Sequence, residues 1–63
     1  MVKWFDPGKG FGFISVEGAH KDVFVHVSAL NRSGLDRLEE GQSVLVRYCQ
    51  GQKGLEALTV SRK

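Results

Sequence analysis

The feature of this sequence that most restricts its fold is a strict alternation of side chains between residues 23 and 27. Val23, Val25 and Val27 fall on one side of an extended chain, and Phe24 and His26 fall on the other. Such alternation over a short run is typical of a β-strand with one face in a core. The valine face is therefore predicted to be buried, and the face that carries two rings needs another explanation.

Four more short runs, separated by turn residues, extend this pattern. A chain of 63 residues buries only roughly 60% of the surface that it exposes when unfolded, which excludes a large cleft between two domains. Residues 1–63 are predicted to be one all-β domain, a five-stranded antiparallel barrel, because closure removes exposed sheet edges. The four additional strands are predicted at residues 2–5, 11–14, 43–49 and 55–60. Leu58 and Val60 are expected on one face of the last of these strands.

The segments between the strands carry recognisable turn chemistry. Asp6-Pro7-Gly8 predicts a type II turn with a positive φ at Gly8. The segment 28–41 does not follow the strand pattern, and its leucines permit one or two helical turns, with Ser33 as N-cap and Gly41 as the C-terminal stop. A loop anchored by the same leucines fits equally well.

Five of the six aromatic residues lie within the first 24 positions, and two of them form the sharpest motif. The segment from Lys9 to Ile14, KGFGFI, matches the start of a ribonucleoprotein signature. Phe11 and Phe13 share one strand face, Gly12 is expected to leave the opposite side bare, and Lys9 is within reach of a phosphate.

A phenylalanine pair spaced in this way more often forms one wall of a core. Here Ile14 and the valines of the next strand already fill the opposite face, and a small barrel has a single interior. The rings of Phe11 and Phe13 are therefore predicted to face outward, where Phe24 and His26 complete a platform for stacked bases.

Other residues remain open to two interpretations. Strict alternation places Trp4 inside with Val2, and only a bulge or twist would bring it out. A lone histidine is usually a surface residue, which is the expectation for His20, whereas His26 lies in phase with Phe24. The lysines predicted to contact phosphates would ordinarily be solvated, and only their nearness to the rings or to a turn favours that role: they are Lys3, Lys9 and Lys53.

Composition narrows the remaining functional classes. The formal net charge is +2, and the charges of residues 1–30 cancel, so a polyanionic partner is permitted but not demanded. Cys49 is the only cysteine, which excludes an intramolecular disulfide, deprives a zinc site of thiol ligands, and fits a reducing, cytoplasmic setting. No apolar run approaches the roughly 18 residues of a membrane span. No cofactor, metal or membrane association is predicted.

The motif alone would suggest an RNA recognition motif, but that fold needs two packed helices for which this chain lacks the amphipathic stretches. Instead, the chain resembles bacterial cold shock proteins from end to end. The resemblance implies a barrel of the oligonucleotide/oligosaccharide-binding (OB) type. It is carried by VKWF (2–5), KGFGFI (9–14), DVFVH (22–26), SAL (28–30), EGQ (40–42) and GQKG (51–54).

The same resemblance implies a function and a site. Such proteins are thought to act as RNA chaperones that hold pyrimidine-rich single strands of RNA or DNA, with Trp4 at the surface. Asp22 would hydrogen-bond a base edge, and Lys53 would touch the strand. The full set of implied binding residues is Lys3, Trp4, Lys9, Phe11, Phe13, Asp22, Phe24, His26 and Lys53.

The chain also departs from the family's usual pattern. Val27 and Leu35 stand where aromatic residues are common, so two stacking rings are expected to be missing. Asp6 stands where asparagine is usual and is expected to hinder phosphates. The start at Met1-Val2-Lys3 is compatible with an excised domain, one of a tandem pair.

Two rival functions follow from the same residues. The aromatic face or an edge strand could dock a protein partner or a second copy, although a monomer is expected. A nuclease using His26 and Asp22 is disfavoured, because four residues of extended strand separate them by about 13 Å. No catalysis is predicted.

Overall fold

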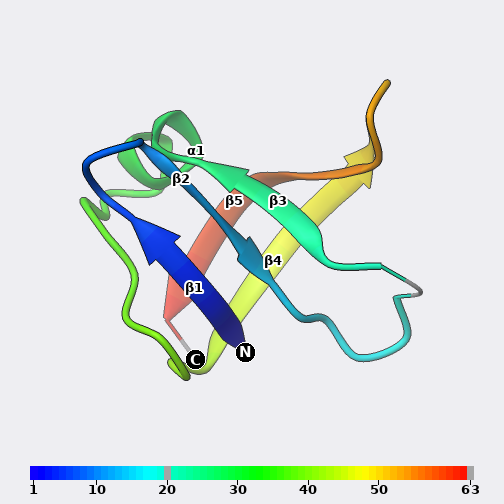
Figure 1. Cartoon of the computed structure of the whole chain (residues 1–63), viewed down its shortest axis with the longest axis horizontal. Helices are drawn as coiled ribbons and strands as arrows, with labels where there is room; N and C mark the ends of the chain where they lie inside the picture. Colours follow the sequence, from blue (N-terminus) through cyan, green and yellow to red (C-terminus); the bar gives the residue numbers. More distant parts are fainter. Residues whose placement is uncertain (20, 63) are drawn as a thin grey trace.

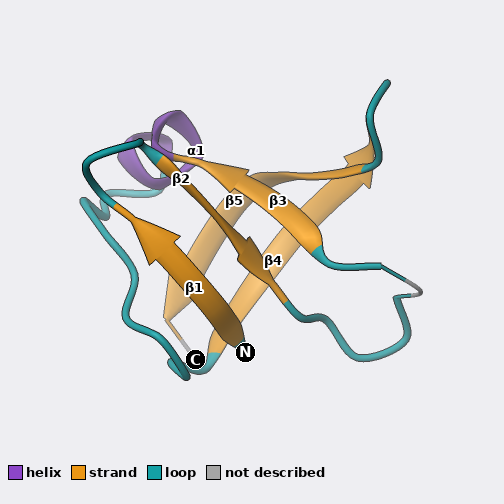
Figure 2. Ribbon diagram, viewed as in Figure 1, coloured by secondary structure: helices purple, strands orange, loops and turns teal. Residues whose placement is uncertain are grey.

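The computed structural model of the protein describes residues 1–19 and 21–62 and shows a five-stranded sheet with one short helix (Figures 1 and 2). Strands β1, β2 and β3 lie in front in this view, and β4 and β5 pass behind them. The expectation for His20 lies outside the described residues. The elements are β1 (Val2–Asp6), β2 (Phe11–Ile14), β3 (Val23–His26), α1 (Val27–Arg32), β4 (Val44–Gln50) and β5 (Leu55–Arg62).

The sheet is mixed rather than wholly antiparallel. Its order is β1-β2-β3-β5-β4, with β3 and β5 parallel through the pairing of Phe24 with Glu56. Parallel neighbours require a long crossover, which α1, the following loop and β4 provide here. The prediction of an all-antiparallel arrangement is therefore wrong, while the prediction of five strands is confirmed.

The sheet is also not closed into a barrel. Among the described residues, β1 and β4 occupy the two ends of the strand order and form no ladder with each other. Val2 instead bonds to the loop before β4, donating to the Gln42 carbonyl at 2.9 Å and accepting from the Gly41 amide at 2.8 Å. These two bonds join the ends of the sheet without strand pairing.

The core lies between the front and back strands, and small aliphatic side chains fill it. Ile14, Val23 and Val25 are fully buried, as their alternation predicts. Val60 of β5 is 1% exposed, but Leu58 is 44% exposed, so the expectation that these two share a face is wrong. The buried set comprises Val2, Ile14, Val23, Val25, Ala29, Leu30, Leu38, Val44 and Val60.

A β-bulge explains the exposure of Leu58. Arg47 of β4 pairs with Thr59 and Tyr48 pairs with Ala57, so the pairing skips Leu58. An extra residue on one strand reverses the alternation on either side of it. Ala57 and Val60 consequently both face the core although they are three residues apart.

The helix is shorter than the segment that the sequence left open, and different residues bound it. His26 is its N-cap, and Ser33, predicted as an N-cap, is its C-cap. Gly34, with φ of 80°, ends the helix through the bond from the Leu35 amide to the Leu30 carbonyl at 2.7 Å. Gly41 plays no part in this stop. No described helix is long and apolar enough to cross a membrane.

The turn between β1 and β2 is not of the predicted type II. Positive φ occurs at Gly10 and not at Gly8. Asp6 Oδ1 accepts from the Gly8 amide at 2.9 Å and from the Lys9 amide at 3.2 Å, so the carboxylate organises the turn.

Candidate nucleic-acid interface

A second β-bulge, in β1, brings the tryptophan to the surface. Val2 pairs with Ile14 and Trp4 pairs with Phe13, so the pairing skips Lys3. Val2 is 1% exposed and Trp4, two residues later, is 41% exposed. Strict alternation would have buried Trp4, and the bulge produces the alternative arrangement that the sequence left open.

Trp4 joins three phenylalanine rings in one cluster. Its ring centroid lies 5.7 Å from that of Phe11 and 5.4 Å from that of Phe13. Phe24 lies 5.7 Å from both Phe11 and Phe13, stacked on the first and edge-on to the second. The three phenylalanines are half-buried, so part of each ring remains open to a ligand. We call Trp4, Phe11, Phe13, Phe24 and His26 the aromatic face.

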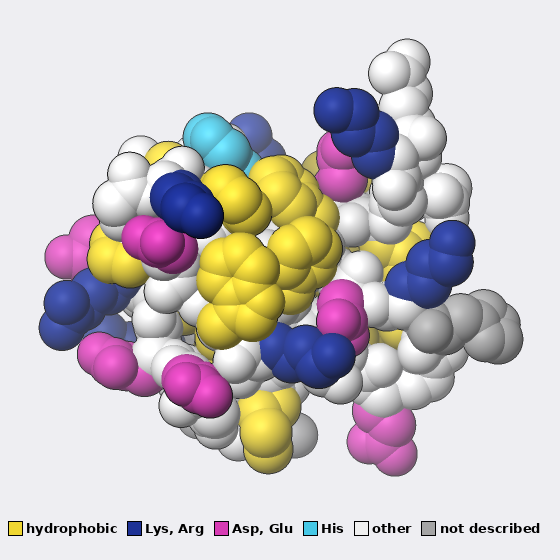
Figure 3. Space-filling model, viewed as in Figure 1, with side chains coloured by type: hydrophobic (Ala, Val, Ile, Leu, Met, Phe, Trp, Pro, Cys, Tyr) yellow, Lys and Arg dark blue, Asp and Glu magenta, His cyan; other side chains and the backbone are white. Residues whose placement is uncertain are grey.

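The space-filling view shows how this surface is surrounded (Figure 3). Hydrophobic side chains gather at its centre over β1, β2 and β3, with a histidine at one border and side chains of both charges around them. Trp4 and His26 are exposed and the three phenylalanines are half-buried, whereas the sequence predicted outward-facing rings without specifying how far each is covered. An apolar centre with a charged border suits planar rings that are attached to phosphates.

His26 is held at the border of the face by the helix that follows it. It pairs with Phe11 across β2 and β3. Its Nδ1 accepts from the Ser28 amide at 3.1 Å and lies 2.9 Å from Ser28 Oγ. Because Nδ1 acts as an acceptor, the neutral ring carries its proton on Nε2, which leaves a donor for a ligand. The side chain therefore has two roles, capping α1 and completing the aromatic face.

The charged residues predicted to bind the strand differ in whether their side chains already have a partner. Lys3 Nζ lies 3.0 Å from Asp22 Oδ2, so these two side chains form an ion pair on the surface. Lys9 is exposed in the turn after β1, and its ammonium makes no hydrogen bond to any described residue. The structure thus places Asp22 beside Lys3, an association that sequence spacing did not reveal.

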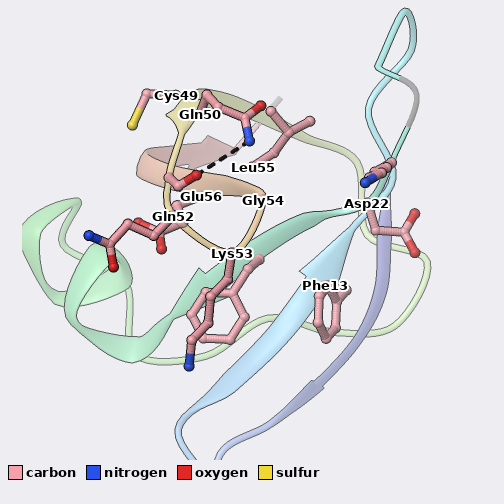
Figure 4. A pocket seen from close by; sticks show the side chains of 12 residues that line it. Phe13, Asp22, Cys49, Gln50, Gln52, Lys53, Gly54, Leu55 and Glu56 are labelled. Carbon is pink, nitrogen blue, oxygen red and sulfur yellow. Dashed lines mark hydrogen bonds between the residues drawn. The ribbon is translucent and has the colours of Figure 1, made fainter.

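A groove of about 1040 Å³ continues from the aromatic face toward the β4–β5 hairpin. The end of the β2–β3 loop, with Lys21 and Asp22, forms one wall, and the hairpin with Lys53 forms the other. Figure 4 shows Phe13 and Lys53 at this groove, on different elements. The groove therefore brings Lys53 to the same surface as the rings.

Gly12 has a role that differs from the one expected. A Cβ at this position would lie 2.6 Å from Phe5 Cα and would also meet the Trp4 carbonyl oxygen. Its side of the strand is therefore not bare but covered by the β1 backbone. The glycine permits the β1 backbone at Trp4 and Phe5 to pass close to β2.

The departures from the family's usual pattern also have structural explanations. Asp6 Oδ1 is engaged by two backbone amides of the turn. Val27 begins α1, and Leu35 packs against the core. Neither of the last two residues adds a ring to the aromatic face.

Sequence reasoning missed Glu56, which lines the groove with Phe13 and Phe24. Uninterrupted alternation over 55–60 would put Glu56 on the same face as Val60, in the core. The bulge at Leu58 reverses that phase and places Glu56 outside. A glutamate at a position that strict alternation assigns to the core, with no basic residue beside it in the strand, was the available signal that the strand contains a bulge.

Comparison with known proteins agrees with this architecture. The family model described as the "'Cold-shock' DNA-binding domain" matches residues 1–63. The chain belongs to the cold shock domain family. Its all-β, five-stranded fold is consistent with the OB fold of that family, whose members bind nucleic acids.

Individual members of the cold shock domain family are similar along most of their length. "Cold shock-like protein CspB" of Yersinia pestis is 55% identical over 60 residues, which are 95% of this chain and 86% of that protein. "Cold shock protein CspA" of Staphylococcus saprophyticus is 56% identical over 59 residues, covering 94% and 88% of the two chains. The corresponding protein of Staphylococcus aureus is 54% identical over 59 residues.

Proposed function

We propose that this cold shock domain binds single-stranded RNA or DNA by stacking bases on the aromatic face. The observation that carries the proposal is the cluster of four rings with neighbouring centroids 5.4 to 5.7 Å apart, on one side of the sheet. Stacked bases contribute about 1–3 kcal/mol each when an aromatic residue supports them. Paired bases in a duplex keep their faces covered, so a duplex is the weaker ligand.

The remaining side chains have complementary roles in this proposal. Lys3, Lys9 and Lys53 contact phosphates around the rings, and Asp22 accepts a hydrogen bond from a base edge. The Lys3–Asp22 ion pair is exposed enough to rearrange when a strand binds, because its side chains are 57% and 35% accessible. We propose a preference for pyrimidine-rich strands and activity as a monomeric, cytoplasmic RNA chaperone, without catalysis.

Trp4 supplies a direct assay, since it is the only tryptophan. Its fluorescence is titrated with a pyrimidine single strand and with the duplex formed from that strand and its complement. We expect saturable quenching by the single strand and much weaker quenching by the duplex. Equal quenching by both, or none by either, would rule out base stacking as the mode of binding.

A control variant separates the aromatic face from the rest of the surface. Leu45 is 57% exposed on β4 and lines neither the ring cluster nor the groove. Leu45→Ala is expected to bind the single strand as tightly as the original protein. A large loss of affinity in this variant would instead show that the single strand contacts β4, outside the aromatic face.

A further inference from the structure

Glu56 lies in line with the rings across the sheet. Phe24 pairs with Phe13 on β2 and with Glu56 on β5, and Phe13 pairs in turn with Trp4 on β1. Side chains of directly paired residues project from the same face of a sheet. The row therefore runs from Trp4 through two phenylalanines to a carboxylate.

The backbone of the β4–β5 turn holds the Glu56 side chain close to the groove. A Cβ on Gly51 would lie 2.7 Å from Glu56 Oε1, so the carboxylate rests in the space that the glycine leaves. The φ of Gly51 is not positive, so its backbone conformation does not require glycine. Its missing side chain matters for space, because a Cβ here would collide with the side chain of Glu56. Figure 4 shows Glu56 beside this turn, at the groove that Phe13 and Lys53 also line.

The two carboxylates of the groove differ in their partners. Asp22 is bound by Lys3 Nζ at 3.0 Å. Within residues 1–19 and 21–62, the carboxylate of Glu56 forms neither an ion pair nor a hydrogen bond. An ionised carboxylate can only accept hydrogen bonds, so a base beside Glu56 interacts well only if it presents a donor.

We infer that Glu56 determines specificity by favouring, for the base stacked on Phe24, a base with an amino group on its pairing edge. Among pyrimidines this means cytosine, whose N4 amino group donates to a carboxylate from the outer end of the edge. Uracil and thymine are disfavoured because their single N3–H donor is flanked by the O2 and O4 acceptors, which repel a carboxylate. The inference rests on the proposed function, because the base must first stack on the aromatic face. At the position stacked on Phe24, the protein would therefore prefer cytosine to the other pyrimidines.

The test measures affinity by Trp4 quenching for an oligouridine of about eight nucleotides, within the site size of a small single-strand-binding barrel. A matched set replaces one uridine at a time by cytidine. We expect the best cytidine-containing strand to bind about fivefold tighter than oligouridine, the lower end of discrimination by a good base contact. Glu56→Gln offers both a donor and an acceptor, so the ratio should fall below about twofold, mainly through tighter binding of oligouridine.

Glu17→Gln is the matched control, since it removes the same charge from an exposed loop residue that does not line the groove. It should retain the preference for cytidine. Equal binding of all strands by the original protein, or an unchanged ratio in Glu56→Gln, would overturn the role of Glu56 while leaving base stacking intact. Absence of quenching by every strand would instead overturn the proposed function, and this inference with it.

Discussion

Phe13→Ala tests whether the central ring of the aromatic face belongs to the binding surface or to the core. Phe13 lies 5.4 Å from the Trp4 centroid and 5.7 Å from that of Phe24, and it is not among the buried core residues. Losing one stacked base should weaken single-strand binding about 5- to 150-fold, equivalent to about 1–3 kcal/mol.

The stability of the same variant should fall by a smaller amount than a core deletion would cause. Two aromatic contacts are lost, each contributing about 0.5–1.5 kcal/mol. The expected decrease in the free energy of unfolding is therefore about 1–3 kcal/mol, compared with about 3–5 kcal/mol for removal of a fully buried phenylalanine. Urea unfolding followed by circular dichroism measures this difference, and Trp4 quenching measures the affinity.

Phe13→Leu keeps the result interpretable if the alanine variant is too unstable to study. Leucine preserves apolar volume and removes only the flat ring, so the fold should be retained while affinity falls. Unchanged affinity in a folded Phe13→Leu variant would refute stacking at this position. A loss of more than about 4 kcal/mol of stability in Phe13→Ala would show that the ring functions as core.

Four further predictions concern packing, charge and linkage. Gly12→Ala should decrease the free energy of unfolding by about 1–3 kcal/mol or more in urea titrations, because the new methyl group meets the β1 backbone; a neutral effect would show that β1 moves freely. Lys3→Ala should change stability by no more than about 1 kcal/mol, since its pair with Asp22 is exposed, and a larger loss would contradict this. The logarithm of affinity should fall with that of salt concentration with a slope no steeper than about −2, as three lysines contact phosphates, and a slope twice as steep would require other cations. A saturating single strand should raise Tm, and an unchanged Tm would mean that the folded state does not bind it.

The regular parts of this fold were predictable from side-chain alternation. The strands β2 and β3 contain no bulge, so the alternation correctly separated the buried Ile14, Val23 and Val25 from the outward Phe11 and Phe24. The resemblance to cold shock proteins added the OB-type fold and the exposure of Trp4, which alternation alone did not give.

The two bulges limited what alternation could establish about the site. A single skipped residue, Lys3 in β1 and Leu58 in β5, reverses the phase of its strand. The exposure of Trp4 therefore remained ambiguous, and Glu56 was not recognised. The parallel pairing of Phe24 with Glu56 depends on a crossover, which local sequence patterns do not encode.

Short-range hydrogen bonding limited the prediction of turns and of the helix. The side chain of Asp6 accepts from two successive amides, and the backbone turn closes without the positive φ at Gly8 that the neighbouring proline and glycine suggested. Ser33 has the chemistry of an N-cap, yet its hydroxyl donates to the Ala29 carbonyl and accepts from the Val60 amide, which ties the end of α1 to β5. A residue type that suits several caps does not identify which end of a helix it occupies.

Binding of a single strand on the aromatic face is tested most directly by a map of amide chemical-shift changes in the labelled protein when a pyrimidine single strand is added. The largest changes are expected along the row of Trp4, Phe13, Phe24 and Glu56 and at Lys53, while Leu45 is expected to change little. Changes centred on β4, with the aromatic face unaffected, would contradict this mode of binding.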